Sequence, residues 1–171
     1  MTKYFTITQR ISNYLFSLMK KITISTLSIY FISCTAIEPI KNKEDSKSLV
    51  VDSLLKKGAE FNKDKDFYSA LDIYDKLITI DSSRGDLYFK RANCKAQLLK
   101  FESSSKDYFK ALELHYRIED TYYNLGCNFA SIDKDSAAIE YFMKALEIDP
   151  NDLDTKLQIK IVKNKLINIK K

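Results

Sequence analysis

Residues 121–150 read TYYNLGCNFASIDKDSAAIEYFMKALEIDP and carry the clearest structural pattern in the sequence. Apolar residues recur at helical spacing in two segments that a short polar turn separates. Each segment carries a small residue, Gly126 or Ala138, where two helices could cross closely. Pro150 ends the second segment because the residue before a proline is pushed out of the α-helical region. We therefore predict one helix over about residues 119–131 and another over 135–147.

The same pattern recurs twice toward the N-terminus at a constant spacing. Gly58, Ala92 and Gly126 are evenly spaced without an insertion, and we call the step from each of them to the next the repeat offset. Short helix pairs cannot bury their apolar faces alone, so the repeat predicts three pairs stacked side by side. We expect these residues to pack the pairs together: Gly58, Ala70, Tyr74, Ala92, Tyr108, Ala111, Gly126, Ala138, Phe142 and Ala145.

This period and these small and aromatic positions resemble the tetratricopeptide repeat. The third unit matches all eight signature positions: Tyr122, Leu125, Gly126, Phe129, Ala138, Phe142, Ala145 and Pro150. The second unit departs most, with Arg91, Lys95 and Tyr116 where a leucine, an aromatic residue and a proline are expected. The resemblance implies an all-α solenoid with units at about residues 51–84, 85–118 and 119–150.

Residues 151–171 continue the helical pattern. Leu153, Leu157 and Ile161 recur every four residues, with Val162 and Leu166 alongside and lysines on the rest of the surface. Such an amphipathic helix fits a cap that closes the open end of the stack. The alternative is a helical site for a partner.

The resemblance also implies an inner surface lined by the first helix of each pair. Aromatic and amide side chains at these positions suit peptide capture, although ordinary solvated helix faces would look the same. The predicted groove residues are Leu55, Asn62, Phe89, Lys90, Asn93, Gln97, Tyr123 and Asn124, with Ala59, Asp86, Asp120 and Cys127 at further inner positions.

One subtype of the family grips acidic C-termini with a clamp of lysine, arginine and asparagine. Asn93 and Asn124 match its two asparagines. Phe89 stands in the place of the first lysine, and Asp154 and Gln158 in the places of the later basic pair. The clamp is therefore not expected.

Catalytic chemistry is not indicated. His115 is the single histidine and lies at a predicted helix end without a serine or cysteine motif nearby. Cys94 and Cys127 are expected to pack between helices, with a disulfide as the alternative. We find no phosphate-binding loop, metal-ligand spacing or paired-acid signature, and expect no catalytic residue, cofactor or metal.

The net charge of +5 comes from the two ends of the chain. Residues 1–33 carry +4, residues 34–50 are balanced, residues 52–150 carry 15 bases against 18 acids, and residues 151–171 carry +4. A nucleic-acid binder would need a basic stripe on its folded surface. The mildly acidic repeats argue against that class of partner.

A second feature lies near the N-terminus, where residues 19–34 read MKKITISTLSIYFISC. The uncharged run is twelve residues long and would rise about 18 Å as a helix, less than the roughly 30 Å of a bilayer core. A basic start, a short apolar run and a cysteine resemble a bacterial lipoprotein signal peptide, with Cys34 as the lipidated residue. We interpret residues 1–18 as an upstream start extension, 19–33 as signal peptide and 34–50 as a polar tether. An uncleaved apolar anchor is the alternative.

The sequence thus predicts a lipid-anchored scaffold in the bacterial cell envelope, outside the cytoplasm, that binds a protein or peptide without catalysis. The rival function is a structural subunit of an envelope assembly that uses its convex face or its C-terminal helix.

Overall fold

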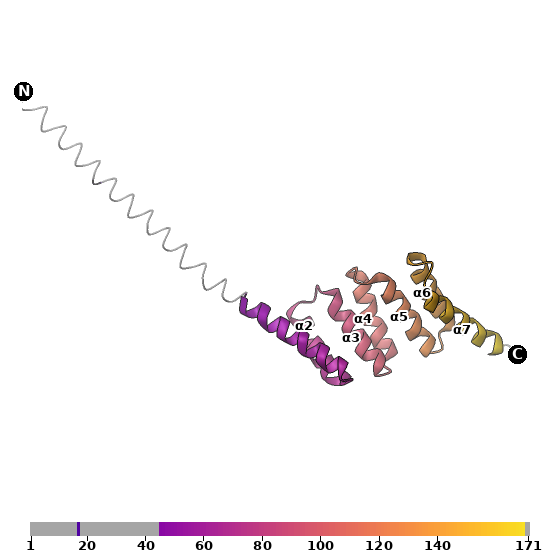
Figure 1. Cartoon of the computed structure of the whole chain (residues 1–171), viewed down its shortest axis with the longest axis horizontal. Coiled ribbons are helices and arrows are strands. Elements are labelled where there is room, and N and C mark those ends of the chain that lie inside the picture. Colours follow the sequence, from indigo (N-terminus) through magenta and orange to yellow (C-terminus); the bar gives the residue numbers. More distant parts are fainter. Residues whose placement is uncertain (1–16, 18–44, 170–171) are drawn as a thin grey trace, which may run out of the picture. The chain divides into compact units, whose positions relative to one another are not determined.

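The computed structural model describes residue 17 and residues 45–169, and Figure 1 shows the order of the helices. None of these residues lies in a β-strand, and residues 51–169 belong to one compact unit. The predicted all-α helical repeat is confirmed. Residues 45–63 are helical and are followed by α2 (Phe67–Ile80), α3 (Gly85–Gln97), α4 (Phe101–Glu113), α5 (Ile118–Ser131), α6 (Asp135–Ile148) and α7 (Leu153–Ile169).

Small residues allow the helices to pack closely. From α2 onward, each helix packs mainly against the next one in the sequence. A Cβ atom added to Gly126 would lie 2.5 Å from the Phe142 ring, and one added to Gly58 would lie 3.0 Å from Ile73 Cγ2. All ten residues named above as packing positions are buried. The repeat offset therefore places equivalent side chains at equivalent helix contacts.

The turn inside each helix pair also repeats, through its backbone. Lys65, Leu99 and Asp133 have φ angles of 61°, 59° and 58°, and the repeat offset separates each of them from the next. Each precedes the second helix of its pair by two positions. A left-handed conformation is unfavourable for residues with a Cβ atom, so the helix packing on both sides holds these turns in place.

The second helices of the first and third pairs start differently. Asp66 is the N-cap of α2 and accepts a hydrogen bond from the Ser69 amide at 3.1 Å. Asp135 is the first residue of α6, after the N-cap Lys134, and is buried. It accepts a hydrogen bond from Lys165 Nζ of α7 at 3.0 Å, so its carboxylate joins two helices.

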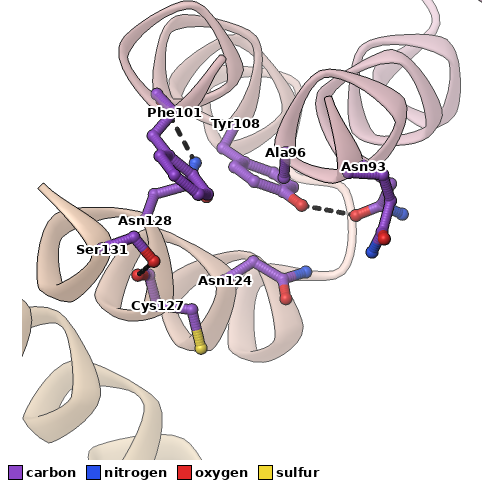
Figure 2. A pocket seen from close by; sticks show the side chains of 9 residues that line it. Asn93, Ala96, Phe101, Tyr108, Asn124, Cys127, Asn128 and Ser131 are labelled. Atoms are coloured by element: carbon purple, nitrogen blue, oxygen red, sulfur yellow. Dashed lines mark hydrogen bonds between the residues drawn. The ribbon is translucent and has the colours of Figure 1, made fainter. Parts of the chain in front are cut away.

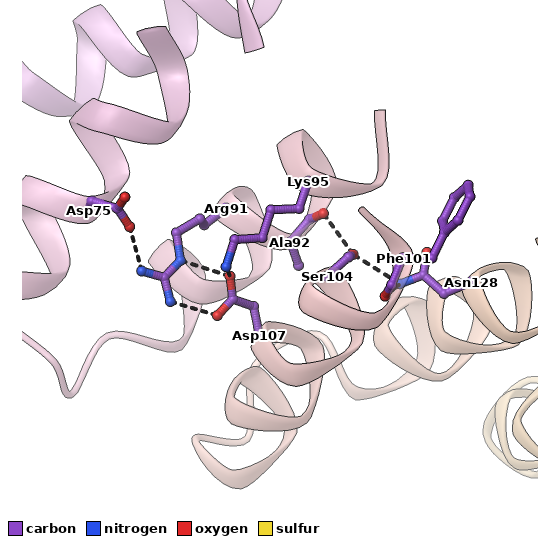
Figure 3. Close-up of polar contacts among 8 residues, drawn as sticks. All are labelled: Asp75, Arg91, Ala92, Lys95, Phe101, Ser104, Asp107 and Asn128. Carbon is purple, nitrogen blue, oxygen red and sulfur yellow. Dashed lines mark hydrogen bonds and ion pairs between the residues drawn. The ribbon is translucent and has the colours of Figure 1, made fainter. Parts of the chain in front are cut away.

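Three helices are joined by ion pairs where the second unit departs from the repeat pattern (Figure 3). Asp107 of α4 has only 7% of its side chain exposed and accepts hydrogen bonds from Arg91 and from Lys95 Nζ. Arg91 also contacts Asp75 of α2, at 2.5 Å. Hydrogen-bonded charges thus occupy the two positions where the family has a leucine and an aromatic side chain.

Helix α7 packs on α6 through a face that includes Val162, as expected, but not the three residues that recur every four positions. Thr155 is fully buried and Val162 nearly so, with Ile159 beside them in the core. Leu153, Leu157 and Ile161, which we expected to face the stack, are 75%, 53% and 50% exposed. The four-residue spacing predicts a stripe correctly but does not say which side of the helix is covered.

Residues 45–50, which the sequence analysis placed in the tether, are helical and continue into residues 51–63. The predicted start extension, the signal peptide, Cys34 and the remainder of the tether lie outside the described residues. Among the described residues, no helix combines the length and the apolar character needed to cross a membrane.

Candidate functional site

A pocket of about 240 Å³ opens between α3, α4 and α5 (Figure 2). Helix α5 contributes amide, thiol and hydroxyl side chains, and α3 and α4 supply the other lining residues. We call it the amide pocket. It is lined by Asn93, Ala96, Gln97, Phe101, Tyr108, Asn124, Cys127, Asn128 and Ser131.

Hydrogen bonds orient two of the three asparagines. The Tyr108 hydroxyl donates to Asn93 Oδ1, so the amide NH₂ of Asn93 remains available to a ligand. Asn128 is buried, and its Nδ2 donates to Ser104 Oγ at 2.9 Å and to Ser105 Oγ at 3.2 Å. Asn124 has no hydrogen-bond partner for its carboxamide among the described residues. The pocket therefore offers both amide donors and an amide acceptor to a peptide backbone.

A second pocket, of about 390 Å³, adjoins the first at Asn124 and lies between α5, the end of α6 and the start of α7. We call it the acidic pocket because five carboxylates line it and no basic residue does. The side chains that line it are Glu119, Asp120, Tyr123, Asn124, Asp149, Asp152 and Asp154.

Most of these carboxylates are outside any ion pair. Asp120 pairs with Arg117 at 2.8 Å at an exposed position. None of the ion pairs among the described residues includes Glu119, Asp149, Asp152 or Asp154. A hydrogen bond from Thr155 lowers the pKa of Asp152, so this carboxylate stays charged well into the acidic range. The pocket is strongly negative at neutral pH.

The eight predicted groove residues lie in several different environments in the structure. Asn93, Gln97 and Asn124 line the amide pocket, and Tyr123 and Asn124 line the acidic pocket. Lys90 forms an ion pair with Asp86 at 2.9 Å on α3. On the helix of residues 45–63, Leu55 packs partly against the core, and exposed Asn62 accepts a weak hydrogen bond from Cys94 Sγ at 3.6 Å.

Phe89 is not a surface anchor, because its side chain is only 6% exposed. Its ring packs edge-on against Tyr108 and Tyr116, each with a centroid distance of 5.6 Å, and the Arg117 guanidinium lies over it. Tyr116 replaces the proline of the repeat pattern, so this turn offers an aromatic partner that covers Phe89. Tyr123 is the aromatic side chain that lines the acidic pocket, and burial raises its pKa to about 12.

Among the described residues, the two thiols and the histidine lie in different surroundings. Cys94 is fully buried and Cys127 lines the amide pocket, and both are free thiols. Burial raises the pKa of each thiol, which disfavours the reactive thiolate. His115 is exposed in the turn after α4 with a φ of 54°.

Sequence reasoning missed two parts of the site. The carboxylates after α6 were not predicted to form a site, although the run EIDPNDLD is dense in acids. Asn128 was not predicted to belong to the site. The available signal was Ser104, a polar residue at the position where the other two units have Ala70 and Ala138. The buried Ser104 hydroxyl donates to the Ala92 carbonyl at 2.8 Å and accepts a hydrogen bond from Asn128 Nδ2 at 2.9 Å.

Comparison with known proteins agrees with the helical-repeat fold described above. Residues 119–152 match the family model described as tetratricopeptide repeat. Human sperm-associated antigen 1 is 24% identical over 118 residues, which make up 69% of this chain but only 13% of that protein. This chain therefore corresponds to a small part of the length of the curated relative that it matches.

Three solved structures share the helix arrangement. The first TPR of Spaghetti (RPAP3) bound to the HSP90 peptide SRMEEVD has a TM-score of 0.64 at 23% identity, covering 68% of this chain and 93% of that one. The Arabidopsis OM64 TPR domain has a TM-score of 0.63 at 22% identity, covering 67% and 95%. The second TPR domain of human RPAP3 with the HSP70 peptide SGPTIEEVD has a TM-score of 0.62 at 21% identity, covering 66% and 94%. The described helices of this chain thus have the fold of the tetratricopeptide-repeat domains.

Proposed function

We propose that this chain is a non-enzymatic scaffold whose amide and acidic pockets together bind a peptide segment of a partner protein. The observation that carries the proposal is that the two pockets adjoin at Asn124 and present available amide groups beside an aromatic ring. Amides can hydrogen-bond a peptide backbone, and Tyr123 can cover an apolar or cationic side chain. Two structural neighbours with this fold are complexes with peptides, which supports the same class of ligand.

The charge of the site favours a basic segment. Both peptides named in those complexes end in Glu-Glu-Val-Asp. Here the acidic pocket would repel such a tail, and Asp154 stands where the clamp subtype has a basic residue. Four carboxylates outside any ion pair complement a lysine or arginine side chain instead.

Two synthetic peptides test this preference on the full chain. The lysine probe is Ac-GKKGSSSSSG-amide, and the glutamate probe replaces both lysines by glutamate. Isothermal titration calorimetry should show binding of the lysine probe that weakens as salt rises, and much weaker binding of the glutamate probe. Equal affinity for the two probes would contradict the proposed charge preference.

Variants then locate the site. Neutralising two partly exposed carboxylates with Glu119→Gln and Asp154→Asn should weaken the lysine probe by about three- to tenfold. Glu147→Gln, which removes an exposed carboxylate of α6 outside both pockets, is the matched control and should have no effect. An equal effect of Glu147→Gln would mean that the probe senses only overall charge.

We also propose that the scaffold is held to a bacterial envelope membrane by lipid on Cys34. The support is the sequence order of basic start, apolar run and cysteine in residues 19–34. Two or more acyl chains hold a protein stably, whereas one holds it only marginally. In a bacterial host fed radiolabelled palmitate, the chain should take up label and Cys34→Ala should abolish it. Membrane retention of both forms without label would favour the uncleaved anchor.

The rival function, an assembly subunit, predicts a different result in cells. Cross-linking followed by mass spectrometry should recover a partner whose capture depends on Asn124 and Glu119 if the groove is used. Capture that survives Asn124→Ala together with Glu119→Gln would favour docking through another surface.

A further inference from the structure

Helix α7 is the first helix of a fourth repeat unit by its register. It begins at Leu153, which follows Glu119, near the start of α5, by one repeat offset. The two helices bury the same face: Thr121 and Thr155 are both fully buried, and Asn128 and Val162 are both at most 3% exposed. The remaining faces of α5 and α7 therefore point to equivalent sides of the stack.

This equivalence places the exposed apolar residues of α7 on the groove side. At the repeat offset, Leu157 corresponds to Tyr123 and Ile161 to Cys127, which line the two pockets. Leu153 is preceded by Asp152 and followed by Asp154, which both line the acidic pocket. We call Leu153, Leu157 and Ile161 the α7 stripe. The stripe continues the groove beyond the acidic pocket.

Lysines occupy the face of α7 on which another repeat helix would pack. Tyr122, Gly126 and Phe129 occupy the signature positions on this face of α5, and Gly126 contacts Phe142 of the next helix. The equivalent residues of α7 are Lys156, Lys160 and Lys163, which are all exposed. An added repeat helix would have to bury these charges, which is costly without partners.

The same lysines argue against a second copy of the chain on the stripe. The three lysines run along one flank of the stripe. In an antiparallel twofold pair of α7 helices packed stripe to stripe, both lysine rows would lie on the same side and repel. At its start the stripe meets the acidic pocket, whose negative charge attracts a basic ligand.

We infer that the α7 stripe is an apolar subsite of the groove, a conclusion that rests on the proposed peptide binding. Its occupant is an extended peptide segment that places a lysine or arginine in the acidic pocket and alternate apolar side chains on the stripe. Alternate side chains of an extended chain recur about every 6.7 Å, close to the rise of about 6 Å between stripe residues four positions apart. The partner segment thus combines a basic residue with an alternating apolar run.

A third peptide tests the subsite on the full chain. The leucine probe, Ac-GKKGLSLSLG-amide, differs from the lysine probe by three Ser→Leu changes. A second peptide with the leucine-probe sequence in reverse order is also measured, because the peptide could lie in the groove in either direction. In at least one order, the leucine probe should bind at least about tenfold more tightly than the lysine probe, because apolar side chains become buried.

The combined change Leu157→Ser and Ile161→Ser should remove this gain and leave the lysine probe unaffected. Ile167→Ser, which alters an exposed apolar residue of α7 outside the stripe, is the matched control and should change neither affinity. Equal binding of the lysine and leucine probes would overturn the apolar subsite while leaving the peptide groove intact. Failure of every probe to bind would overturn both proposals. A dimer that the stripe variant dissociates, measured by sedimentation, would assign the stripe to a second copy and overturn the subsite.

Discussion

At the scale of single residues, the closest helix crossing depends on the missing side chain of Gly126. A Cβ atom there would lie 2.5 Å from the Phe142 ring, which is fully buried. Gly126→Ala should therefore lower the free energy of unfolding by about 1 to 3 kcal/mol. This loss opposes the gain of up to about 1 kcal/mol that alanine gives in a free helix. Urea denaturation measures the change.

A second substitution distinguishes overpacking from other causes. Phe142→Leu removes the ring that the new methyl group would meet. The two changes together should cost less than the sum of the separate costs. Strict additivity would show that Gly126 and Phe142 are not in the contact described here.

Leu99 carries strain in the turn between α3 and α4. Its φ is 59°, and its side chain is largely exposed, so little packing is lost when it is removed. Leu99→Gly should raise the free energy of unfolding by up to about 1 kcal/mol. Lys106→Gly, in the middle of α4, should instead lower it by about 1 kcal/mol. The same sign for both in thermal denaturation would contradict the strained turn.

The buried thiol of Cys94 makes stability depend on alkaline pH. Burial raises its pKa from 9.0 to about 11, so between these values the native state keeps a proton that the unfolded chain has lost. The free energy of unfolding therefore falls as the pH rises from 9 to 11, by up to about 2 to 3 kcal/mol from this group. Cys94→Ala should show a smaller fall across the same range in urea denaturation. An identical fall would assign the effect to tyrosines alone.

At the scale of elements, the second repeat unit replaces apolar packing by charge. Asp107 is nearly buried between Arg91 and Lys95, so Asp107→Ala leaves two cations with little solvent. We expect a loss of about 3 kcal/mol in urea denaturation, with Arg91 keeping its contact to Asp75. Asp75→Ala, which removes the exposed partner of the same arginine, should cost less than about 1 kcal/mol.

Restoring the repeat pattern is the complementary test. Arg91→Leu, Lys95→Phe and Asp107→Ala together return apolar side chains to the two departing positions. Replacement of a buried ionic group by packed apolar residues is often neutral or stabilising. A loss as large as that of Asp107→Ala alone would show that the charges contribute more than the family residues could.

The sequence predicted helices and their pairing well because both follow from local periodicity. It did not predict which side of α7 is covered, since Leu153, Leu157 and Ile161 satisfy the same spacing whether they face the stack or solvent. Nor did it predict that Asp135 would bind Lys165 across two helices, because that contact joins side chains far apart in the sequence.

At the scale of the whole domain, the stacking of the helices brings side chains from different helices together on one surface. Asn93, Gln97, Tyr123 and Asn124 could be named from the sequence because each occupies an inner position of the repeat. The acidic pocket could not, because it forms only where α5, the end of α6 and the start of α7 meet. Phe89 was wrong as an anchor because Tyr116 and Arg117, from the next turn, cover its ring.

An NMR titration tests directly whether a peptide binds between the repeat helices, because it monitors the residues of the chain individually. Amide chemical shifts of the ¹⁵N-labelled full chain would be recorded while the lysine probe is added. We predict that the largest changes fall on the side-chain amides of Asn93 and Asn124 and on the backbone around Tyr123 and Asp154. Changes concentrated outside the two pockets, or no saturable change, would contradict a peptide groove between the repeat helices.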